Sequence, residues 1–251
     1  MSQTFCFGKG WLGNLMQEQA QQEGIEFDGS TTKGTEQSLK WNIGEEVPKE
    51  VNGKAIIVAI PSSKWNIDQL VDFMKSLSKH SIAHLTWVSS TGAFEGDGLV
   101  SEYSEAPPRM TNEKAKRIQH QEEIALSYFP KASIVRLGGL FGFERHPAKF
   151  FTNGRTIPNG EATANMIHGI DAAKLVLTCS QLKVQGLVVG VPPELPSRRA
   201  FYVAAFFYLK LGEANIAPGK EGKHVTSQRI GTEIPFDWKY NNPIKAYELE
   251  N

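Results

Sequence analysis

Three glycines near the amino terminus have the spacing of a phosphate-binding turn. Gly8, Gly10 and Gly13 form the pattern G-x-G-x-x-G directly after the apolar run at residues 4–7. In this pattern the first glycine permits a tight strand-to-helix turn, the second lets a pyrophosphate approach the backbone, and the third lets the helix lie close to the strand. A helix that begins there presents N–H groups and a partial positive charge to the phosphates. Because three such glycines also occur in ordinary loops, the interpretation depends on the surrounding elements.

Four further polar or glycine-containing turns follow predicted strands, at residues 30–33, 61–63, 89–91 and 138–139. In a parallel sheet such turns meet beyond the carboxyl ends of the strands, where ligands bind. Together with the glycine turn they predict a dinucleotide site. The expected cofactor-binding residues are Gly8, Lys9, Gly10, Trp11, Leu12, Gly13, Thr31, Thr32, Lys33, Ile60, Pro61, Ser62, Ser89, Gly138 and Gly139.

The end of the second strand bears on the choice of cofactor. An acidic residue about 20 positions after the motif normally binds the ribose 2′-hydroxyl of NAD, whereas a basic residue accommodates the 2′-phosphate of NADP. Asp28 comes only 15 residues after Gly13, and the usual offset falls nearer Thr31. The stretch at residues 30–33 offers hydroxyls and the cation of Lys33. It favours NADP, with NAD possible, and the alternative is a plain polar turn.

The hydrophobic pattern alternates strands with helices along most of the chain. Four apolar runs, at residues 55–60, 84–88, 133–137 and 187–191, are typical of buried parallel strands. Apolar residues at helical spacing predict helices between them, with Asn66, Thr111 and Asp171 as expected N-caps. This alternation predicts an α/β fold with a doubly wound, parallel Rossmann sheet.

Composition limits the class of protein. The 251 residues include 27 acidic and 27 basic side chains, so charge gives no support for a nucleic-acid or anionic-membrane partner. No apolar run approaches the roughly 20 residues of a membrane helix, and the first strand leaves no room for a signal peptide. Cys6 and Cys179 are expected to be buried free thiols, which favours a cytoplasmic protein. No group of residues has metal-ligand spacing.

With these segments in order, the sequence resembles the extended short-chain dehydrogenase/reductase superfamily, in its NAD-dependent epimerase/dehydratase branch. The resemblance covers nearly the whole chain. It implies one NAD(P)-binding Rossmann domain over residues 1–251, with a small carboxyl-terminal substrate lobe from about residues 143–165 and 192–251. A monomer and a homodimer are both compatible with it. The matching segments are residues 8–13, 87–92, 135–142 and 165–171.

The resemblance also implies a catalytic set of Ser or Thr, Tyr and Lys, the last two as Y-x-x-x-K. Ser90 corresponds to the serine, with Thr91 beside it. No Y-x-x-x-K surrounds any tyrosine, and the expected place near residues 111–118 holds Lys114 instead. Other basic candidates on this helix are Lys116, Arg117 and His120, which on most helices would face solvent. Arg145 and His146 are the expected substrate-binding residues.

Two functions remain open on the sequence alone. The first is an NADP(H)-dependent oxidoreductase or epimerase/dehydratase that acts on an unknown small molecule without the usual tyrosine. The second is a dinucleotide-binding sensor or scaffold that does not catalyse. The position of the helix at residues 111–128 relative to Ser90 discriminates between them, because catalysis needs a proton-carrying group there.

Overall fold

A seven-stranded sheet forms the centre of the computed structural model, which describes residues 3–105, 110–142 and 144–249. Its order is β10-β7-β5-β4-β1-β2-β3, and every pairing is parallel. The chain starts in the middle, moves outward to β3 and then returns to β4, so the switch point lies between β1 and β4. The predicted doubly wound parallel sheet is confirmed. The strands are β1 Gln3–Phe7, β2 Glu26–Thr31, β3 Leu39–Lys40, β4 Ala55–Val58, β5 His84–Ser90, β7 Ser133–Leu137 and β10 Gly186–Gly190.

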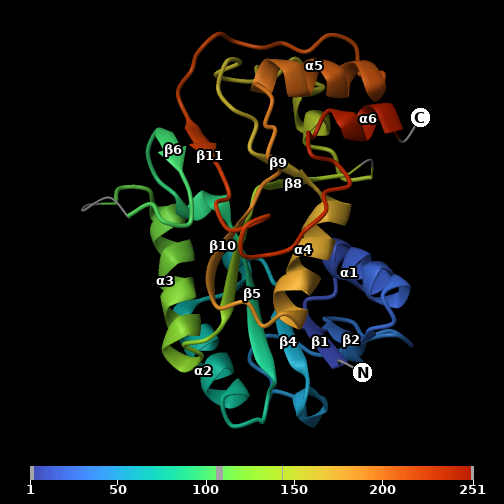
Figure 1. The fold of residues 1–251 in the computed structure, drawn as a ribbon, viewed down its shortest axis with the longest axis vertical. Helices are drawn as coiled ribbons and strands as arrows, with labels where there is room; N and C mark the ends of the chain where they lie inside the picture. Colours follow the sequence, from blue (N-terminus) through green and yellow to red (C-terminus); the bar gives the residue numbers. More distant parts are fainter. Residues whose placement is uncertain (1–2, 106–109, 143, 250–251) are drawn as a thin grey trace.

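Two helices cover each face of this sheet (Figure 1). Helices α1 (Trp11–Gln22) and α4 (Gly169–Gln181) pack on one face, against side chains such as Cys6. Helices α2 (Ile67–Leu77) and α3 (Glu113–Tyr128) pack on the other face, against side chains such as Phe7. Because both faces are covered, the central strands need apolar side chains at every position, which explains their continuous apolar runs.

Helices α2, α3 and α4 each begin at a capping side chain, and two of the three expected caps are wrong. Asn66 forms the predicted capping box with Gln69 at the start of α2. Helix α3 is capped by Asn112, and Thr111 instead donates to Glu95. Helix α4 begins earlier than expected, with the ring of His168 accepting from the Ile170 N–H. Of the observed caps, Asn112 lies one residue after the expected one, and His168 lies three residues before it. In both cases two polar residues stand near the helix start, and the sequence alone does not show which of them is the cap.

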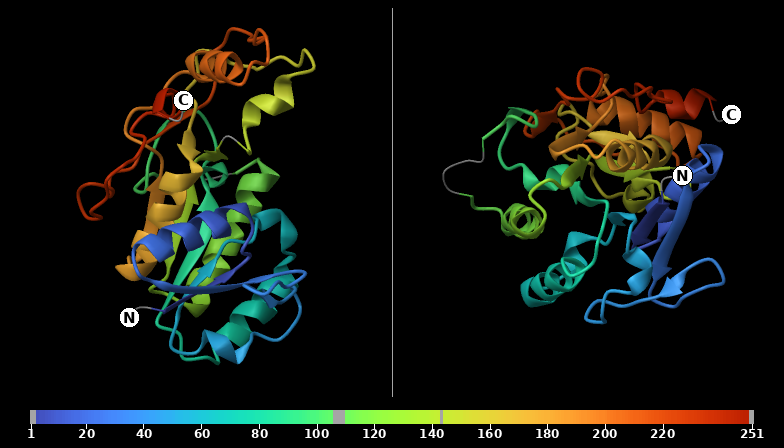
Figure 2. Two further views of the ribbon diagram at one scale, coloured as in Figure 1. Left: turned by 90° about the vertical axis from the view of Figure 1, so that its right-hand side faces the viewer. Right: turned by 60° about the horizontal axis from the view of Figure 1, so that its bottom comes forward.

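A small lobe lies at one end of the sheet (Figures 1 and 2). Its core is a cluster of mostly aromatic side chains that includes Phe141, Phe201 and Tyr247. Residue 143, where the lobe is expected to begin, lies outside the described residues. The elements of and around the lobe are β8 Gly139–Phe141, η4 Pro147–Phe151, β9 Met166–His168, α5 Arg198–Tyr208 and α6 Lys245–Leu249. Three further single turns are η1 Lys49–Val51, η2 Ser62–Lys64 and η3 Thr91–Ala93.

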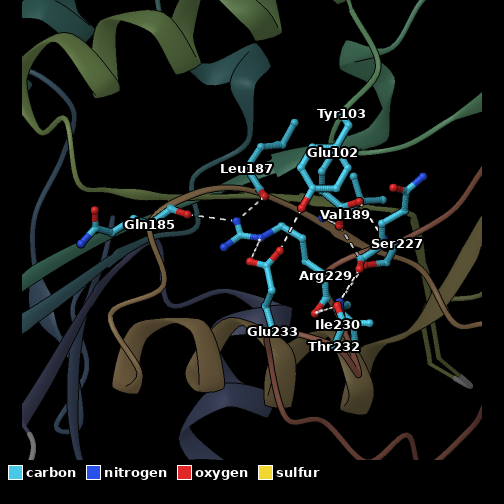
Figure 3. A network of polar contacts seen from close by, with 11 residues as sticks. Glu102, Tyr103, Gln185, Leu187, Val189, Ser227, Arg229, Ile230, Thr232 and Glu233 are labelled. Atoms are coloured by element: carbon cyan, nitrogen blue, oxygen red, sulfur yellow. Dashed lines mark hydrogen bonds and ion pairs between the residues drawn. The ribbon is translucent and has the colours of Figure 1, made fainter.

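The carboxyl-terminal tail leaves the lobe and runs back along the edge of the sheet. Strand β11 (Lys223–Val225) pairs with β6 (Gly98–Val100) in a separate two-stranded sheet. Beyond it, Glu102 accepts hydrogen bonds from the Val189 N–H at 3.0 Å and the Ser227 hydroxyl at 2.8 Å (Figure 3). Arg229 donates to the Leu187 carbonyl at 2.7 Å. The tail therefore covers edge strand β10, whose free backbone groups would otherwise face solvent.

His146 makes the stability of the lobe depend on pH. Its ring is 2% exposed, accepts from the Ala148 N–H and bonds Tyr247. Burial lowers the pKa of His146 to about 4, against about 6.5 in the unfolded chain. As the pH falls from about 6.5 to 4, His146 therefore becomes protonated in the unfolded state but stays neutral in the folded state. We expect the free energy of unfolding to fall by up to about 3 kcal/mol over this window.

Urea unfolding of the native chain, His146→Leu and the exposed control His120→Gln at pH 7, 5.5 and 4.5 measures this contribution. The native chain and His120→Gln should lose stability more steeply than His146→Leu. Equal slopes for the native chain and His146→Leu would contradict the assignment.

Candidate functional site

A cavity of about 940 Å³ opens at the carboxyl ends of the parallel strands, at the switch point of the sheet. This is the place and the size expected for a small-molecule site in a doubly wound fold. Five different turns contribute to its wall. The lining residues are Gly8, Lys9, Gly10, Trp11, Leu12, Ser30, Thr31, Thr32, Trp41, Asn42, Ile43, Ala59, Ile60, Pro61, Ser62, Lys64, Trp87, Val88, Ser89, Ser90, Lys114, Ile118, Gln121, Leu137, Gly138, Gly139, Leu140 and Arg145.

The glycine turn has no room for a side chain at its first position and open space at its second. Gly8 has a φ of +87°, and a Cβ there would lie 2.7 Å from the Ile60 side chain. A Cβ at Gly10 would meet only the Gly8 carbonyl, at 4.0 Å. Gly10 precedes α1 without a capping side chain, and the first helical bond runs from the Asn14 N–H to the Gly10 carbonyl. The first N–H groups of α1 therefore lie beside the cavity, where an anion can accept from them.

Trp11 joins the glycine turn to the rest of the molecule. Its indole occupies the space that side chains at Gly142 and Gly169 would need, because added Cβ atoms there would lie 2.8 Å and 2.4 Å from the ring. The guanidinium of Arg145 lies over the same ring, 5.4 Å from its centroid. The first residue of α1 thus packs against the first residue of α4 and against the entrance to the lobe.

The wall around the end of β2 contains a buried cation. The Lys9 N–H donates to the Ser30 carbonyl, and the Lys9 side chain, 5% exposed, donates to the Gln37 carbonyl at 2.8 Å. Burial lowers the pKa of Lys9. Asp28, the acid that came too early in the sequence, forms an ion pair with Lys54 at 2.5 Å and does not line the cavity.

The opposite end of the cavity brings a cation next to Ser90. The Ser90 hydroxyl accepts from the Gly92 N–H at 3.0 Å. A Cβ placed on Gly92 would lie 3.3 Å from the Ser90 Oγ and from the Ile118 side chain, and 3.4 Å from the Lys114 Cε. Lys114 and Ile118 therefore face Ser90 from one side of α3, four residues apart. Both belong to the segment near residues 111–118 where the resemblance implies the missing Y-x-x-x-K.

The charged side chains that line the cavity are all positive. The lining set contains four cations, Lys9, Lys64, Lys114 and Arg145, and no carboxylate or histidine. None of the four forms an ion pair with another described residue. Since the whole chain carries a formal charge of zero, this concentration is local. Such a site attracts anionic ligands and excludes cationic ones.

A buried polar network supports the strand end that carries Ser90. Arg136 pairs with Glu122 at 2.6 Å and lies over the Phe94 ring, while Glu122 also accepts from the Ser89 hydroxyl. Glu122 is on α3 and Ser89 on β5, so the network fixes the distance between the helix that carries Lys114 and the strand that carries Ser90. On the same helix, Ile118 and Lys114 line the cavity about one and two turns before Glu122.

The structure brings most of the predicted site residues to one cavity. Of the expected residues, Gly13, Lys33, Thr91 and His146 do not line it. Gly13 packs under the turn, against the Gly8 carbonyl and the Lys9 stem. Thr91 is buried behind Ser90, and His146 belongs to the core of the lobe. The roles of all these residues stay predictions.

Two parts of the cavity wall were not predicted from the sequence. One is a mainly apolar segment beside the end of β2, and the other is a polar side chain on α3. Trp41, Asn42 and Ile43 follow edge strand β3, and the short apolar segment at this place was the available signal. Nothing in the sequence indicates that Gln121 lines the cavity, because polar residues on a helix usually face solvent. Its amide donates to the Ser62 carbonyl at 3.0 Å, and its buried Oε1 has no partner among the described residues.

Within residues 3–105, 110–142 and 144–249, no three His, Cys, Asp or Glu side chains are placed to share a metal ion. No described helix is long and apolar enough to cross a membrane.

Comparison with known proteins places the chain in a fold group. No family model matches it. Protein YeeZ of Escherichia coli K12 is 25% identical over an alignment of 273 residues that covers 97% of this chain and 98% of YeeZ. Among solved structures, the UDP-N-acetylglucosamine 4-epimerase of Bacillus cereus has a TM-score of 0.74 at 15% identity, covering 99% of this chain and 97% of that one. Human epimerase family protein SDR39U1, solved with NADPH, has a TM-score of 0.74 at 16% identity, covering 99% of both chains.

These likenesses define the class of fold. The chain has the Rossmann fold of NAD-dependent epimerase/dehydratase and short-chain dehydrogenase/reductase-type proteins, over its whole length. A further similar structure is that of a conserved protein of unknown function from Silicibacter pomeroyi DSS, with a TM-score of 0.76 at 17% identity, covering 99% of this chain and 97% of that one. The resemblance inferred from the sequence motifs is confirmed at the level of fold.

Removing one partner of the buried ion pair should be costly. We expect Arg136→Met to lower the free energy of unfolding by about 3 to 5 kcal/mol, because Glu122 would keep a buried charge without its counterion. The double variant Arg136→Met, Glu122→Leu removes both charges and should recover most of this loss. Urea denaturation of the three proteins measures it. A single variant within about 1 kcal/mol of the native chain would show that the pair contributes little.

Proposed function

We propose that this chain is an NADP(H)-binding oxidoreductase or epimerase of the nucleotide-sugar epimerase/reductase kind. The observation that carries the proposal is a cavity at the sheet switch point that contains four cations and no carboxylate next to an uncapped helix amino terminus. NADP(H) has a pyrophosphate and a further phosphate, so it supplies the negative charge that this wall lacks. NAD normally requires an acidic residue for its ribose hydroxyls, and no described acid lines the cavity.

The residues present suit a dinucleotide. The open space at Gly10 and the free N–H groups of α1 fit a pyrophosphate. The Ser30 hydroxyl, 1% exposed, lines the cavity without a partner among the described residues, which is costly unless a ligand satisfies it. Trp41 and Ile43 offer an apolar wall for an adenine ring, and Gly138 and Gly139 line the cavity just after β7.

Chemistry would take place at Ser90 and Lys114. A bound nicotinamide supplies or accepts a hydride. The Ser90 hydroxyl is placed to hydrogen-bond a substrate carbonyl or hydroxyl, and the Lys114 ammonium is placed to hold the proton that moves to or from this oxygen. Arg145, over Trp11 at the mouth toward the lobe, is the proposed contact for the rest of the substrate.

The names of the similar solved proteins agree with this proposal. They include a UDP-N-acetylglucosamine 4-epimerase, a dTDP-4-dehydrorhamnose reductase from Clostridium acetobutylicum, and SDR39U1 with NADPH. The descriptions concern those proteins, and a nucleotide-linked substrate for this chain stays a proposal.

One observation favours a second function, a non-catalytic dinucleotide sensor. The resemblance implies a Y-x-x-x-K pair near residues 111–118, and the side chains of this segment that line the cavity are Lys114 and the apolar Ile118. An apolar side chain there cannot bind a ribose hydroxyl. A sensor needs the cavity but not the proton at Lys114, so turnover separates the two functions.

Cofactor binding at the glycine turn can be tested with Gly10→Val. The new side chain would enter open space in the empty protein, so the fold should persist, but it would occupy the approach of the pyrophosphate. We expect Gly10→Val to abolish NADPH binding in a fluorescence titration, while the exposed α1 control Asn14→Val binds as the native chain does. In the native chain NADPH should bind more tightly than NADH. Retained affinity in a folded Gly10→Val protein would place the cofactor elsewhere.

Lys114→Met tests the proposed proton carrier. The native chain is incubated with NADPH or NADP⁺ and a panel of nucleotide sugars and small keto acids. Net oxidation or reduction of the cofactor is followed at 340 nm, and epimerised sugar products are separated by chromatography. For any substrate found, kcat should fall about 100-fold or more in Lys114→Met, with the Kd for NADPH within about threefold. The exposed variant Lys116→Met, two residues along the same helix, serves as control. Unchanged kcat in Lys114→Met would exclude the role, and absence of turnover across the panel would favour the sensor.

A further inference from the structure

Lys223, on the carboxyl-terminal tail, is a partly buried cation without a counterion among the described residues. Its ammonium has three N–H donors, and within the described structure only one of them is used, in a hydrogen bond to the Phe94 carbonyl at 2.7 Å. Burial, together with the nearby positive charges of Lys114 and Arg136, lowers the pKa of Lys223. Arg136 is neutralised by Glu122, whereas neither Lys114 nor Lys223 forms an ion pair in the described part of the chain. Two uncompensated cations therefore lie near each other.

Both cations reach the single turn η3, which directly follows Ser90. The Lys223 ammonium holds the carbonyl of Phe94, the residue after this turn. The Lys114 Cε lies 3.4 Å from where a Cβ would stand on Gly92, in the middle of the turn, and the Ser90 Oγ lies 3.3 Å from the same point. The Ser90 hydroxyl therefore lies at a turn that two lysines reach, one from α3 and one from β11.

The backbone around Lys223 is held in place by contacts that do not involve its ammonium. Strand β11 pairs with β6 (Figure 1). The Asn165 amide donates to the Lys223 carbonyl at 2.8 Å, and its Oδ1 accepts from the Val225 N–H at 2.9 Å. The Asn165 carbonyl in turn accepts from the Gly139 N–H at 2.7 Å, and Gly139 lines the cavity. These contacts fix the tail relative to the cavity, so the fold does not need a charged side chain at residue 223.

From these contacts we infer that Lys114 and Lys223 form a subsite for a carboxylate or phosphate group of the substrate, an inference that rests on the proposed function for the role of Ser90. Lys114 lines the cavity and Lys223 does not, so the anion would lie at the mouth of the cavity, beside η3. There it would accept charge-assisted hydrogen bonds from both ammonium groups and offset their mutual repulsion.

The subsite narrows the class of substrate. An anion bound there holds its carrier close to Ser90, which is placed to bind the reacting oxygen. The reacting part of the substrate is therefore acidic, as in a keto acid, a sugar acid or a phosphorylated carbonyl compound, and a neutral sugar ring would leave both cations without a partner. Lys223 is the specificity-determining residue, and it comes from the tail.

Pyruvate and methyl pyruvate test this inference as a matched pair, because they share a keto group and only pyruvate carries a charged carboxylate. Isothermal titration calorimetry is carried out on the chain saturated with NADP⁺, which occupies the cofactor part of the cavity and cannot deliver a hydride. We expect the native chain to bind pyruvate about 10-fold or more tightly than methyl pyruvate. Inorganic phosphate is titrated in parallel, and the anion that binds more tightly identifies the group that the subsite takes.

Variants of Lys223 separate its charge from its hydrogen bond. Lys223→Gln removes the charge and keeps an N–H donor for the Phe94 carbonyl. The preference for pyruvate and the affinity for phosphate should both fall about 10-fold or more, because a charge-assisted hydrogen bond is lost. Lys223→Arg keeps the charge and should stay within about threefold of the native chain. The control Lys220→Gln, at an exposed lysine on the same tail, should change less than about twofold. Lys114→Gln removes the cation on α3 and should cause a loss similar to that in Lys223→Gln, which gives a second test if Lys223→Gln does not fold.

Three results would overturn the inference. The first is a folded Lys223→Gln protein with the native preference and phosphate affinity. The second is a native chain that binds neither anion. The third is a lowered Tm in Lys223→Gln with equal losses for pyruvate and methyl pyruvate, because a lysine that only anchors the tail would not distinguish the charged ligand from the neutral one.

The outcome also separates the subsite from the proposed function. If NADP⁺ binds and the native chain shows no preference for either anion, the dinucleotide function stands and the subsite is wrong. If NADP⁺ does not bind, the dinucleotide function fails. The same titrations on the chain alone then decide the subsite, since a preference that is lost in Lys223→Gln requires no cofactor.

Discussion

The close approach of three chain segments at Gly8 determines how the rest of the molecule is arranged. With a φ of +87° and the Ile60 side chain where a Cβ would stand, Gly8 lets β1 turn into α1 directly against the end of β4. The same turn places the Lys9 N–H on Ser30 of β2. Three strand ends are therefore fixed relative to the amino terminus of one helix. Trp11 then extends the constraint to α4 and the lobe, because its ring occupies the space left by Gly142 and Gly169. A cavity of about 940 Å³ lies beside these segments.

Much of this arrangement could be predicted from the sequence, because it follows from local patterns. Continuous apolar runs marked the strands that are buried on both faces, and turn residues after them marked one edge of the sheet. Helix starts were less predictable. Thr111 and Asp171 are good capping residues, yet Thr111 is bound to Glu95, and Asp171 accepts from the Lys239 and Tyr240 N–H groups of the tail. A polar residue close to a helix start can serve a distant backbone instead, and no local pattern reveals that.

The site shows the same limit. Strand-end residues such as Ser90 and Gly138 were found because position in the fold determines where they point. The side chains that depend on tertiary packing were not. Lys33 was the natural cation at the end of β2, but Lys9 reaches the cavity wall and Lys33 does not. His146 was expected at the substrate and lies in the lobe core against Tyr247. Conversely, Gln121 and Trp41 line the cavity, although neither belongs to a sequence motif that would have indicated it. Burial and charge compensation decide these cases, and both are properties of the folded chain.

The tail has a consequence for the order in which this protein can be assembled. Strand β10 ends at Gly190, so the whole parallel sheet has been synthesised while the final quarter of the chain is still missing. Until that quarter has been synthesised, Ser227 cannot hold the Glu102 carboxylate that accepts from the Val189 N–H. The Asp171 carboxylate at the start of α4 also lacks its two donors, the N–H groups of Lys239 and Tyr240. Contacts of such long sequence separation form late in folding. During synthesis on the ribosome the sheet therefore has one open edge, and a chain that stops before about residue 227 would present that edge to neighbouring molecules as a template for aggregation.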